Sequence, residues 1–198
     1  GEPYMINIDT CNEHLPKTQQ DLGLSIRQSN LCSEITLATN EERTAVCCLS
    51  SVNLEHFDKW SEDPQFIEDL ITMLDNVIEH YIENAVDTSQ LGGYSANFKR
   101  FTKYIKEGKE GYAKSAYSAY RERSVGLGAM GFHAYLQSQN IAFESIYATG
   151  FNHRAFKHIK SKAVQATERL ADMRGECPDL HNTNRRNAHL LAVAPNAS

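Results

Sequence analysis

A long amphipathic helix is the feature that most constrains the fold of this chain. Asp63 and Pro64 form a typical helix start, with Asp as the N-cap and Pro at the first helical position. The apolar residues that follow at helical spacing are Phe66, Ile67, Leu70, Ile71, Leu74, Val77, Ile78, Tyr81 and Ile82. This pattern predicts a helix that ends near Asp87 and has one face that must be buried.

A second long helix and several strand-like runs complete the predicted secondary structure. The helix spans 149–174, with Gly175 as its stop. The strand-like runs are 4–8, 35–37, 44–50 and 188–194, and a polar loop is expected over 17–24. A charged turn at 40–43 favours a hairpin between the second and third runs, which would bring Cys47 or Cys48 near Cys32.

Composition places the chain among globular proteins and excludes several classes. The 198 residues carry a net charge of -5, which disfavours a broad face for nucleic acid or anionic lipid. No apolar run approaches the ~20 residues that span a bilayer. Five cysteines at irregular spacing disfavour a disulfide scaffold or a zinc site and favour a reducing cytoplasm. Both ends of the chain are expected to continue in a longer protein.

One short stretch holds the strongest candidates for chemistry. Asn30, Cys32 and Glu34 alternate, so in an extended backbone they would share one face. An amide, a thiol and a carboxylate together suit chemistry on a hydroxylated substrate. The alternative is structural, because cysteine is among the most often buried residues.

The glycines at 126–131 match the Gly-x-Gly-x-x-Gly pattern of nicotinamide-dinucleotide sites. The preceding residues, Arg121 to Val125, are poor material for a buried parallel strand, so a turn closely packed before a helix is the favoured interpretation. A helix is expected over 130–139. The region 94–120 is expected to hold one or two short helices, and its mixed basic and aromatic residues favour a solvated surface over a nucleic-acid site.

Four motifs in order resemble the class I ribonucleotide reductase large subunit. They are QSNLCSEI at 28–35, AVCCLSSVNL at 45–54, RSVGLG at 123–128 and LLAVAPNAS at 190–198. Residues 1–4 and 9–12 also fit. The resemblance covers most of the chain and implies an α/β fold. Residues 1–198 would be part of a ten-stranded α/β barrel, with Cys32 on an internal finger loop and 88–120 as a helical surface insertion.

The resemblance also implies residue roles. Cys32 would carry a transient thiyl radical, Glu34 would act as a base towards the 3′ hydroxyl, and Asn30 would hold the sugar. Cys47 would be half of the reducing dithiol, whereas Cys48 falls where the family does not require cysteine. The implied substrate-binding residues are Ser29, Asn30, Leu31, Cys32, Ser33, Glu34, Pro195, Asn196, Ala197 and Ser198.

The implied function is that of a catalytic fragment of ribonucleoside-diphosphate reductase. It would bind no cofactor or metal itself. The radical would come from a metal-containing small subunit and the electrons from a thioredoxin- or glutaredoxin-type reductant. Dimerisation of large subunits and a need for the remaining large-subunit segments are also implied, as in a split gene product or a segment between inteins. Three alternatives stay open: an adenosylcobalamin-dependent reductase, a non-catalytic interaction fragment and a nicotinamide-binding module.

Overall fold

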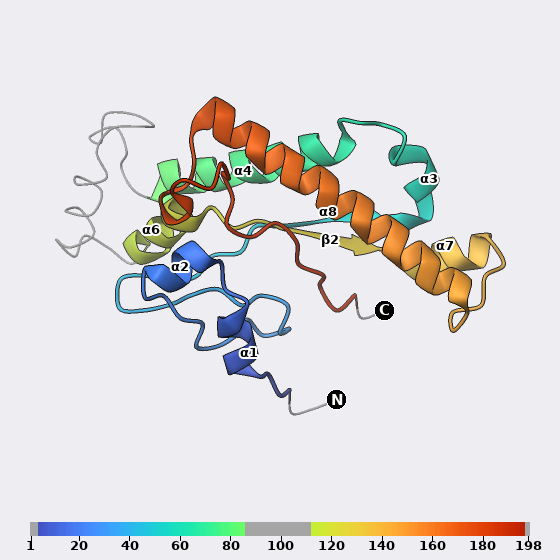
Figure 1. The fold of residues 1–198 in the computed structure, drawn as a ribbon, viewed down its shortest axis with the longest axis horizontal. Helices are drawn as coiled ribbons and strands as arrows, with labels where there is room; N and C mark the ends of the chain where they lie inside the picture. The colour runs from blue at the N-terminus through green and yellow to red at the C-terminus, as the bar shows by residue number, and fades with distance from the viewer. Residues whose placement is uncertain (1–3, 86–111, 197–198) are drawn as a thin grey trace.

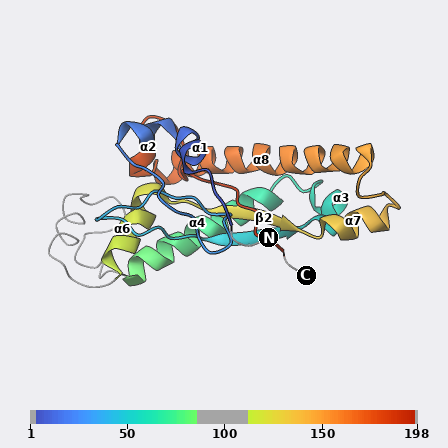
Figure 2. The ribbon, with the colours of Figure 1, turned by 90° about the horizontal axis from the view of Figure 1, so that it is seen from below.

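The computed structural model describes residues 4–85 and 112–196. A two-stranded parallel sheet lies at its centre, formed by β1 (Leu49–Asn53) and β2 (Gly126–Met130). The register pairs Leu49 with Gly126 and Asn53 with Met130. The helices α4 (Phe66–Ala85) and α8 (Ile146–Arg174) pack against each other, and α8 runs along one side of the sheet (Figures 1 and 2).

Shorter elements connect these parts. The chain begins with α1 (Ile8–Glu13) and α2 (Lys17–Asp21). After β1 follow the 3-10 turn η1 (Leu54–His56) and α3 (Phe57–Trp60), and α6 (Ala113–Glu122) precedes β2. The chain then forms α7 (Phe132–Ser138), α8 and the 3-10 turn η3 (Pro178–Leu180).

The C-terminal segment lies parallel to β2 on the side opposite β1. The Val125 N–H donates to the His189 carbonyl at 3.0 Å, and the Leu127 N–H donates to the Leu190 carbonyl at 2.9 Å. Leu127 and Leu191 form a parallel bridge. Among the described residues, β2 is therefore the middle of three adjacent extended segments.

Glycine at position 128 is required by this arrangement. A Cβ there would lie 2.5 Å from the Ala192 carbonyl oxygen and 3.2 Å from the Ser51 hydroxyl. The glycines at 126–131 were predicted to form a turn, and that is wrong for 126–130, which are strand β2 itself. The turn is confined to Gly131, whose φ is 75°, and α7 follows it. Since two of the glycines lie inside the strand, they do not form a phosphate-binding loop after it.

The two long helices agree well with the sequence. The Ser145 hydroxyl caps α8 by accepting from the Ala148 N–H at 3.2 Å, so the helix begins three residues before the predicted start, and Gly175 ends it as predicted. The Asp63 carboxylate accepts from the Gln65 N–H at 2.9 Å and shapes the turn before α4, which itself begins at Phe66. The predicted end of α4 near residue 87 lies outside the described residues.

Buried charges tie α4 to the ends of α6 and α8. The Asp75 carboxylate, which is 0% exposed, accepts from Arg123 Nε at 2.8 Å, Arg174 Nη1 at 2.8 Å and Arg186 Nε at 3.3 Å. Asn187 Nδ2 also donates to it, at 3.2 Å. Burial alone would raise the pKa of Asp75, but the charges of Arg123 and Arg186 outweigh it and hold the pKa below the usual range. This network positions the chain that leads into the C-terminal segment.

Several predicted strands are wrong. Residues 4–7 form no strand with any of the described residues, and α1 follows because the Asn7 side chain caps it by accepting from the Thr10 N–H at 3.2 Å. The predicted loop at 17–24 contains α2. The predicted turn at 40–43 forms, with paired backbone hydrogen bonds between Asn40 and Arg43, but its flanks make no hairpin ladder. Only 49–50 of the predicted strand at 44–50 pairs, because β2 is its partner and begins there.

The region predicted as a helical insertion at 88–120 falls mostly outside the described residues. Its last part belongs to α6, which packs on α4 and has most of its side chains buried. In the part of the chain that the structure describes, no helix is long and apolar enough to cross a membrane.

Candidate functional site

A tight loop presents the predicted radical cysteine. The Asn30 N–H donates to the Ile35 carbonyl at 3.1 Å, and the Ile35 N–H donates back to Asn30 Oδ1 at 3.1 Å. Ser33 takes a left-handed conformation with φ of 66°, and its N–H donates to the Asn30 carbonyl at 3.2 Å. Cys32 is exposed at the tip of this loop. The alternation expected of an extended strand is therefore wrong here, because the backbone turns between Asn30 and Ile35.

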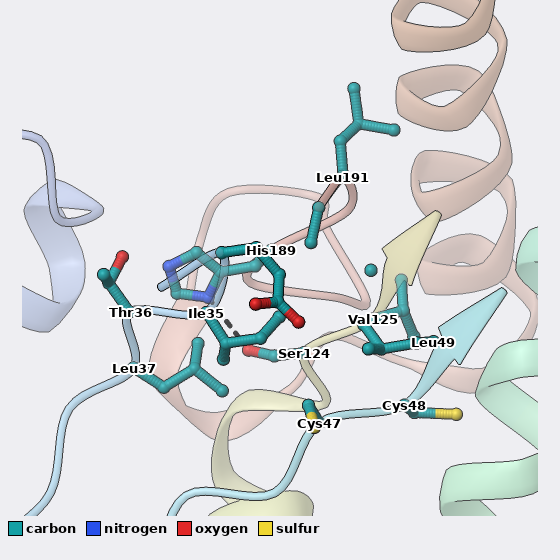
Figure 3. A pocket seen from close by; sticks show the side chains of 13 residues that line it. Ile35, Thr36, Leu37, Cys47, Cys48, Leu49, Ser124, Val125, His189 and Leu191 are labelled. Atoms are coloured by element: carbon teal, nitrogen blue, oxygen red, sulfur yellow. Dashed lines mark hydrogen bonds between the residues drawn. The ribbon is translucent and has the colours of Figure 1, made fainter. Parts of the chain in front are cut away.

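Two adjoining cavities bring other predicted residues together. The first, of about 70 Å³, is lined by Glu34, Cys47, Ser124 and His189 among others, and most of its lining is labelled in Figure 3. The second, of about 190 Å³, is lined by Ser29, Asn30 and Cys47. Residues that line both are Ile35, Leu37 and Cys47. Cys47 thus lines both the cavity that Asn30 lines and the cavity that Glu34 lines.

Other predicted site residues lie apart from these cavities. Leu31, Cys32 and Ser33 are not among the residues that line either one. Pro195 and Asn196 are also outside them, and Asn196 Nδ2 donates to the Ala129 carbonyl at 2.9 Å near the end of β2. Ala197 and Ser198 lie outside the described residues. The structure therefore assembles Ser29, Asn30, Glu34 and Cys47 but not the complete predicted set.

The two adjacent cysteines differ in environment. Cys47 is exposed, whereas Cys48 is half-buried and its thiol donates to the Leu74 carbonyl of α4 at 3.6 Å. Burial raises the pKa of Cys48, and Figure 3 shows the two side chains pointing in different directions. A less acidic, engaged thiol at Cys48 leaves Cys47 as the accessible one.

One oxygen of the Glu34 carboxylate has no partner in the part of the chain that the structure describes. Its Oε2 is buried and has no hydrogen-bond partner among the described residues. A buried carboxylate oxygen without a donor is costly, so this position suits a ligand hydroxyl or another donor in the cavity.

Sequence reasoning missed a hydrogen-bonded trio at the first cavity. Ser124 Oγ lies 3.1 Å from Glu122 Oε2 and 2.9 Å from His189 Nδ1, which Figure 3 shows as a dashed line. Ser124 belongs to a motif that the sequence singled out, but Glu122 sits between two arginines and resembles a solvated surface residue. Only its 1% exposure reveals its role in the interior.

Burial changes the acidity of both ends of this trio. Burial raises the pKa of Glu122 to about 7, against donated hydrogen bonds from Ser118 and Gln19. Burial also lowers the pKa of His189 to about 4, and the charge of Arg185 adds to this. At neutral pH the imidazole is therefore uncharged, and Glu122 is close to its midpoint.

Comparison with known proteins decides the family. A family model described as "Ribonucleotide reductase, barrel domain" matches residues 1–192. The chain belongs to the ribonucleotide reductase barrel-domain family. The resemblance carried by the four sequence motifs is thereby confirmed. No group of three or more potential metal ligands occurs in the described residues of this barrel-domain segment.

Relatives show which part of a reductase this segment matches. It is 45% identical over 198 residues to the "Ribonucleoside-diphosphate reductase large subunit" of Invertebrate iridescent virus 3, covering 100% of this chain and 28% of the relative. It is 47% identical over 199 residues to the "Putative ribonucleoside-diphosphate reductase large subunit" of Frog virus 3, covering 100% of this chain and 31% of the relative. The barrel-domain segment thus spans less than a third of these relatives.

A solved structure supports the same assignment. The "Actinobacillus ureae class Id ribonucleotide reductase alpha subunit" matches with a TM-score of 0.81 and 33% identity, covering 98% of this chain and 33% of that one. The barrel-domain fold is therefore shared, and this segment is a partial α/β unit of it.

Proposed function

We propose that this chain is the part of a ribonucleoside-diphosphate reductase large subunit that carries the radical site. One observation carries the proposal. Asn30 and Glu34 line two adjoining cavities that share the exposed Cys47 as a lining residue, and the loop closed by Asn30 exposes Cys32. A thiol, an amide and a carboxylate at one place are the groups that dehydration of a ribose needs.

Each side chain has a role in this chemistry. Cys32, as a thiyl radical, takes the 3′ hydrogen of a ribonucleoside diphosphate and returns a hydrogen atom at the end. Glu34 accepts the proton of the 3′ hydroxyl, and its unpartnered Oε2 provides the place for that hydrogen bond. Asn30 donates and accepts hydrogen bonds that hold the sugar hydroxyls.

Cys47 supplies reducing equivalents. Together with a second thiol it provides two electrons and two protons, so that the 2′ hydroxyl leaves as water and the two sulfurs become a disulfide. The second thiol belongs to a segment of the large subunit that precedes these residues in the family. A thioredoxin- or glutaredoxin-type protein then reduces the disulfide.

The wider assembly follows from the same proposal. Residues 1–198 would be part of a ten-stranded barrel with the Cys32 loop inside it and a helical insertion at 88–120. The terminal residues 195–198 would bind the substrate phosphate. The large subunit would form a dimer in the cytoplasm and receive its radical from a metal-containing small subunit.

Reconstitution tests this function. The chain is combined with the segments that complete the large subunit, with the small subunit and with a dithiol reductant, and deoxyribonucleotide formation is measured. We expect Cys32→Ser to abolish turnover. Cys47→Ser should abolish turnover when a thioredoxin- or glutaredoxin-type protein is the reductant. Cys11→Ser on α1 should leave turnover unchanged. Full activity of Cys32→Ser would indicate a scaffold role. Activity that requires adenosylcobalamin in place of the small subunit would contradict the proposed radical source.

A further inference from the structure

A buried carboxyl is connected to the first cavity by two hydrogen bonds. Glu122 at the end of α6 is 1% exposed, and its Oε2 lies 3.1 Å from Ser124 Oγ. The same hydroxyl lies 2.9 Å from His189 Nδ1. The imidazole in turn lines the cavity that Glu34 and Cys47 line. A continuous path therefore leads from the protein interior to the candidate active site.

The surroundings of Glu122 allow it to hold or release a proton near neutral pH. Gln19 Nε2 donates to Oε2 at 3.3 Å and the Ser118 hydroxyl donates to Oε1 at 3.0 Å, which favours the carboxylate. Burial disfavours it more strongly, and the pKa rises to about 7. The charged or titratable groups that face Glu122 from the packed elements are Arg43, Cys177, Asp179 and His189.

Two of these groups, Asp179 and Arg43, hold fixed charges at neutral pH. Asp179 is paired with Arg43 and Arg121, and although burial opposes ionisation, Arg43 holds the pKa of Asp179 below its usual range. Burial raises the pKa of Cys177 to about 12, so this thiol stays neutral. Glu122 and His189 are thus the members of this group whose protons can move.

We propose that Glu122, Ser124 and His189 form a proton relay that exchanges one proton with the cavity between Glu34 and Cys47. In the forward direction the Glu122 carboxyl gives its proton to Ser124 Oγ, and the Ser124 hydroxyl gives its own proton to His189 Nδ1. His189 Nε2 then gives its proton to a base in the cavity. Glu122 loses one proton and the cavity gains one, while Ser124 and His189 end with as many protons as they began with.

A neutral imidazole is sufficient for this relay. The proton enters at Nδ1 as another leaves from Nε2, so the ring changes tautomer and need not become a stable cation. The low pKa of His189, about 4, is therefore compatible with the mechanism. When Glu122 is protonated, Nε2 carries the hydrogen and donates to the cavity. When Glu122 is ionised, Nδ1 carries it and Nε2 becomes an acceptor.

This tautomer switch can be measured without turnover. The probe is ¹⁵N NMR of His189 in the complete large subunit from about pH 5.5 to about pH 8.5, a range in which the ring stays neutral. We expect a change from the Nε2–H to the Nδ1–H tautomer with a midpoint near the pKa of Glu122, about 7. A wild-type ring that keeps one tautomer across this range would overturn the relay, and this result requires no variant to fold.

Two serine variants provide matched controls because both hydroxyls bond the same carboxyl. Ser118 contacts Glu122 but not His189, so Ser118→Ala should keep the switch and move its midpoint to higher pH. Ser124→Ala removes the bridge and should uncouple the tautomer from Glu122. Glu122→Gln should leave one tautomer at every pH. An unchanged switch in Glu122→Gln would show that another group controls the ring.

The use of the relay in turnover rests on the proposed function and has its own test. In the reconstituted reductase, the pH–rate profile should contain a limb that Glu122→Gln removes and Ser118→Ala moves to higher pH. A limb that persists in Glu122→Gln would exclude a role in turnover. A complete absence of reductase activity in the wild type would refute the proposed function, whereas the NMR titration would still decide whether the relay exists.

Discussion

Replacing Glu122 by Gln should make this chain more stable at alkaline pH. In the unfolded chain this carboxyl ionises around pH 4.5, but in the folded chain burial holds its proton until about pH 7. Between these two pH values, rising pH therefore lowers the free energy of unfolding. Above the higher value this loss of stability stays constant. Moving the pKa from 4.5 to about 7 corresponds to about 3 kcal/mol.

His189 changes the free energy of unfolding with pH in the opposite direction. Its folded pKa of about 4 lies below the ordinary 6.5, so the unfolded chain binds a proton that the folded chain does not. Stability from this group rises with pH between about 4 and 6.5 and is lost on acidification. In the wild type, the pH dependence due to Glu122 and that due to His189 nearly cancel between about pH 4.5 and 6.5, where both groups contribute.

Urea unfolding of the wild type and Glu122→Gln across this pH range is the assay. We expect equal free energies of unfolding near pH 4.5 and a gain of up to about 3 kcal/mol for the variant at pH 8. In Glu122→Gln, but not in the wild type, the free energy of unfolding should rise with pH between about 4.5 and 6.5, because the contribution of His189 is no longer cancelled. Ser118→Ala is the control, because it keeps the carboxyl and should not gain stability at pH 8. A variant that tracks the wild type at every pH would refute the reasoning.

Three further perturbations test the packing and the thiols. Gly128→Ala should prevent the C-terminal segment from docking, since its Cβ would lie 2.5 Å from the Ala192 carbonyl oxygen, and hydrogen exchange of that segment should increase. Asp75→Ala should cost about 3–5 kcal/mol in urea unfolding, because it removes a fully buried carboxylate that accepts from the buried guanidinium groups of Arg123 and Arg186. In the folded chain, iodoacetamide should modify exposed Cys32 rapidly, whereas Cys177, 1% exposed and with a pKa of about 12, should react only after unfolding.

The sequence was most informative where structure is local. The apolar repeat from Phe66 to Ile82 predicted α4, and Gly175 predicted the end of α8. Helices can be predicted in this way because their hydrogen bonds lie within one segment and their buried face repeats every turn. The four motifs also indicated the correct family by themselves, because their order along the chain is specific.

The strands were predicted poorly because a strand requires a partner that the local sequence does not show. Residues 4–7 look like a strand but pair with none of the described residues, whereas β2, whose glycines look like a turn, pairs on both sides. Gly128 suits the strand only because the Ala192 backbone passes so close to it. That contact joins segments far apart in the chain.

In the candidate site, too, some features can be read from the sequence and others depend on tertiary packing. The sequence alone predicted which residues bear chemistry, namely Asn30, Cys32, Glu34 and Cys47. The tertiary structure decided that Cys47 lines both the cavity of Asn30 and the cavity of Glu34, and that Glu122 at the end of α6 is buried. The chemistry of each side chain follows directly from the sequence. Burial and proximity arise only when distant segments pack, and burial and proximity determine both the pKa of Glu122 and its hydrogen-bonded path to the cavity.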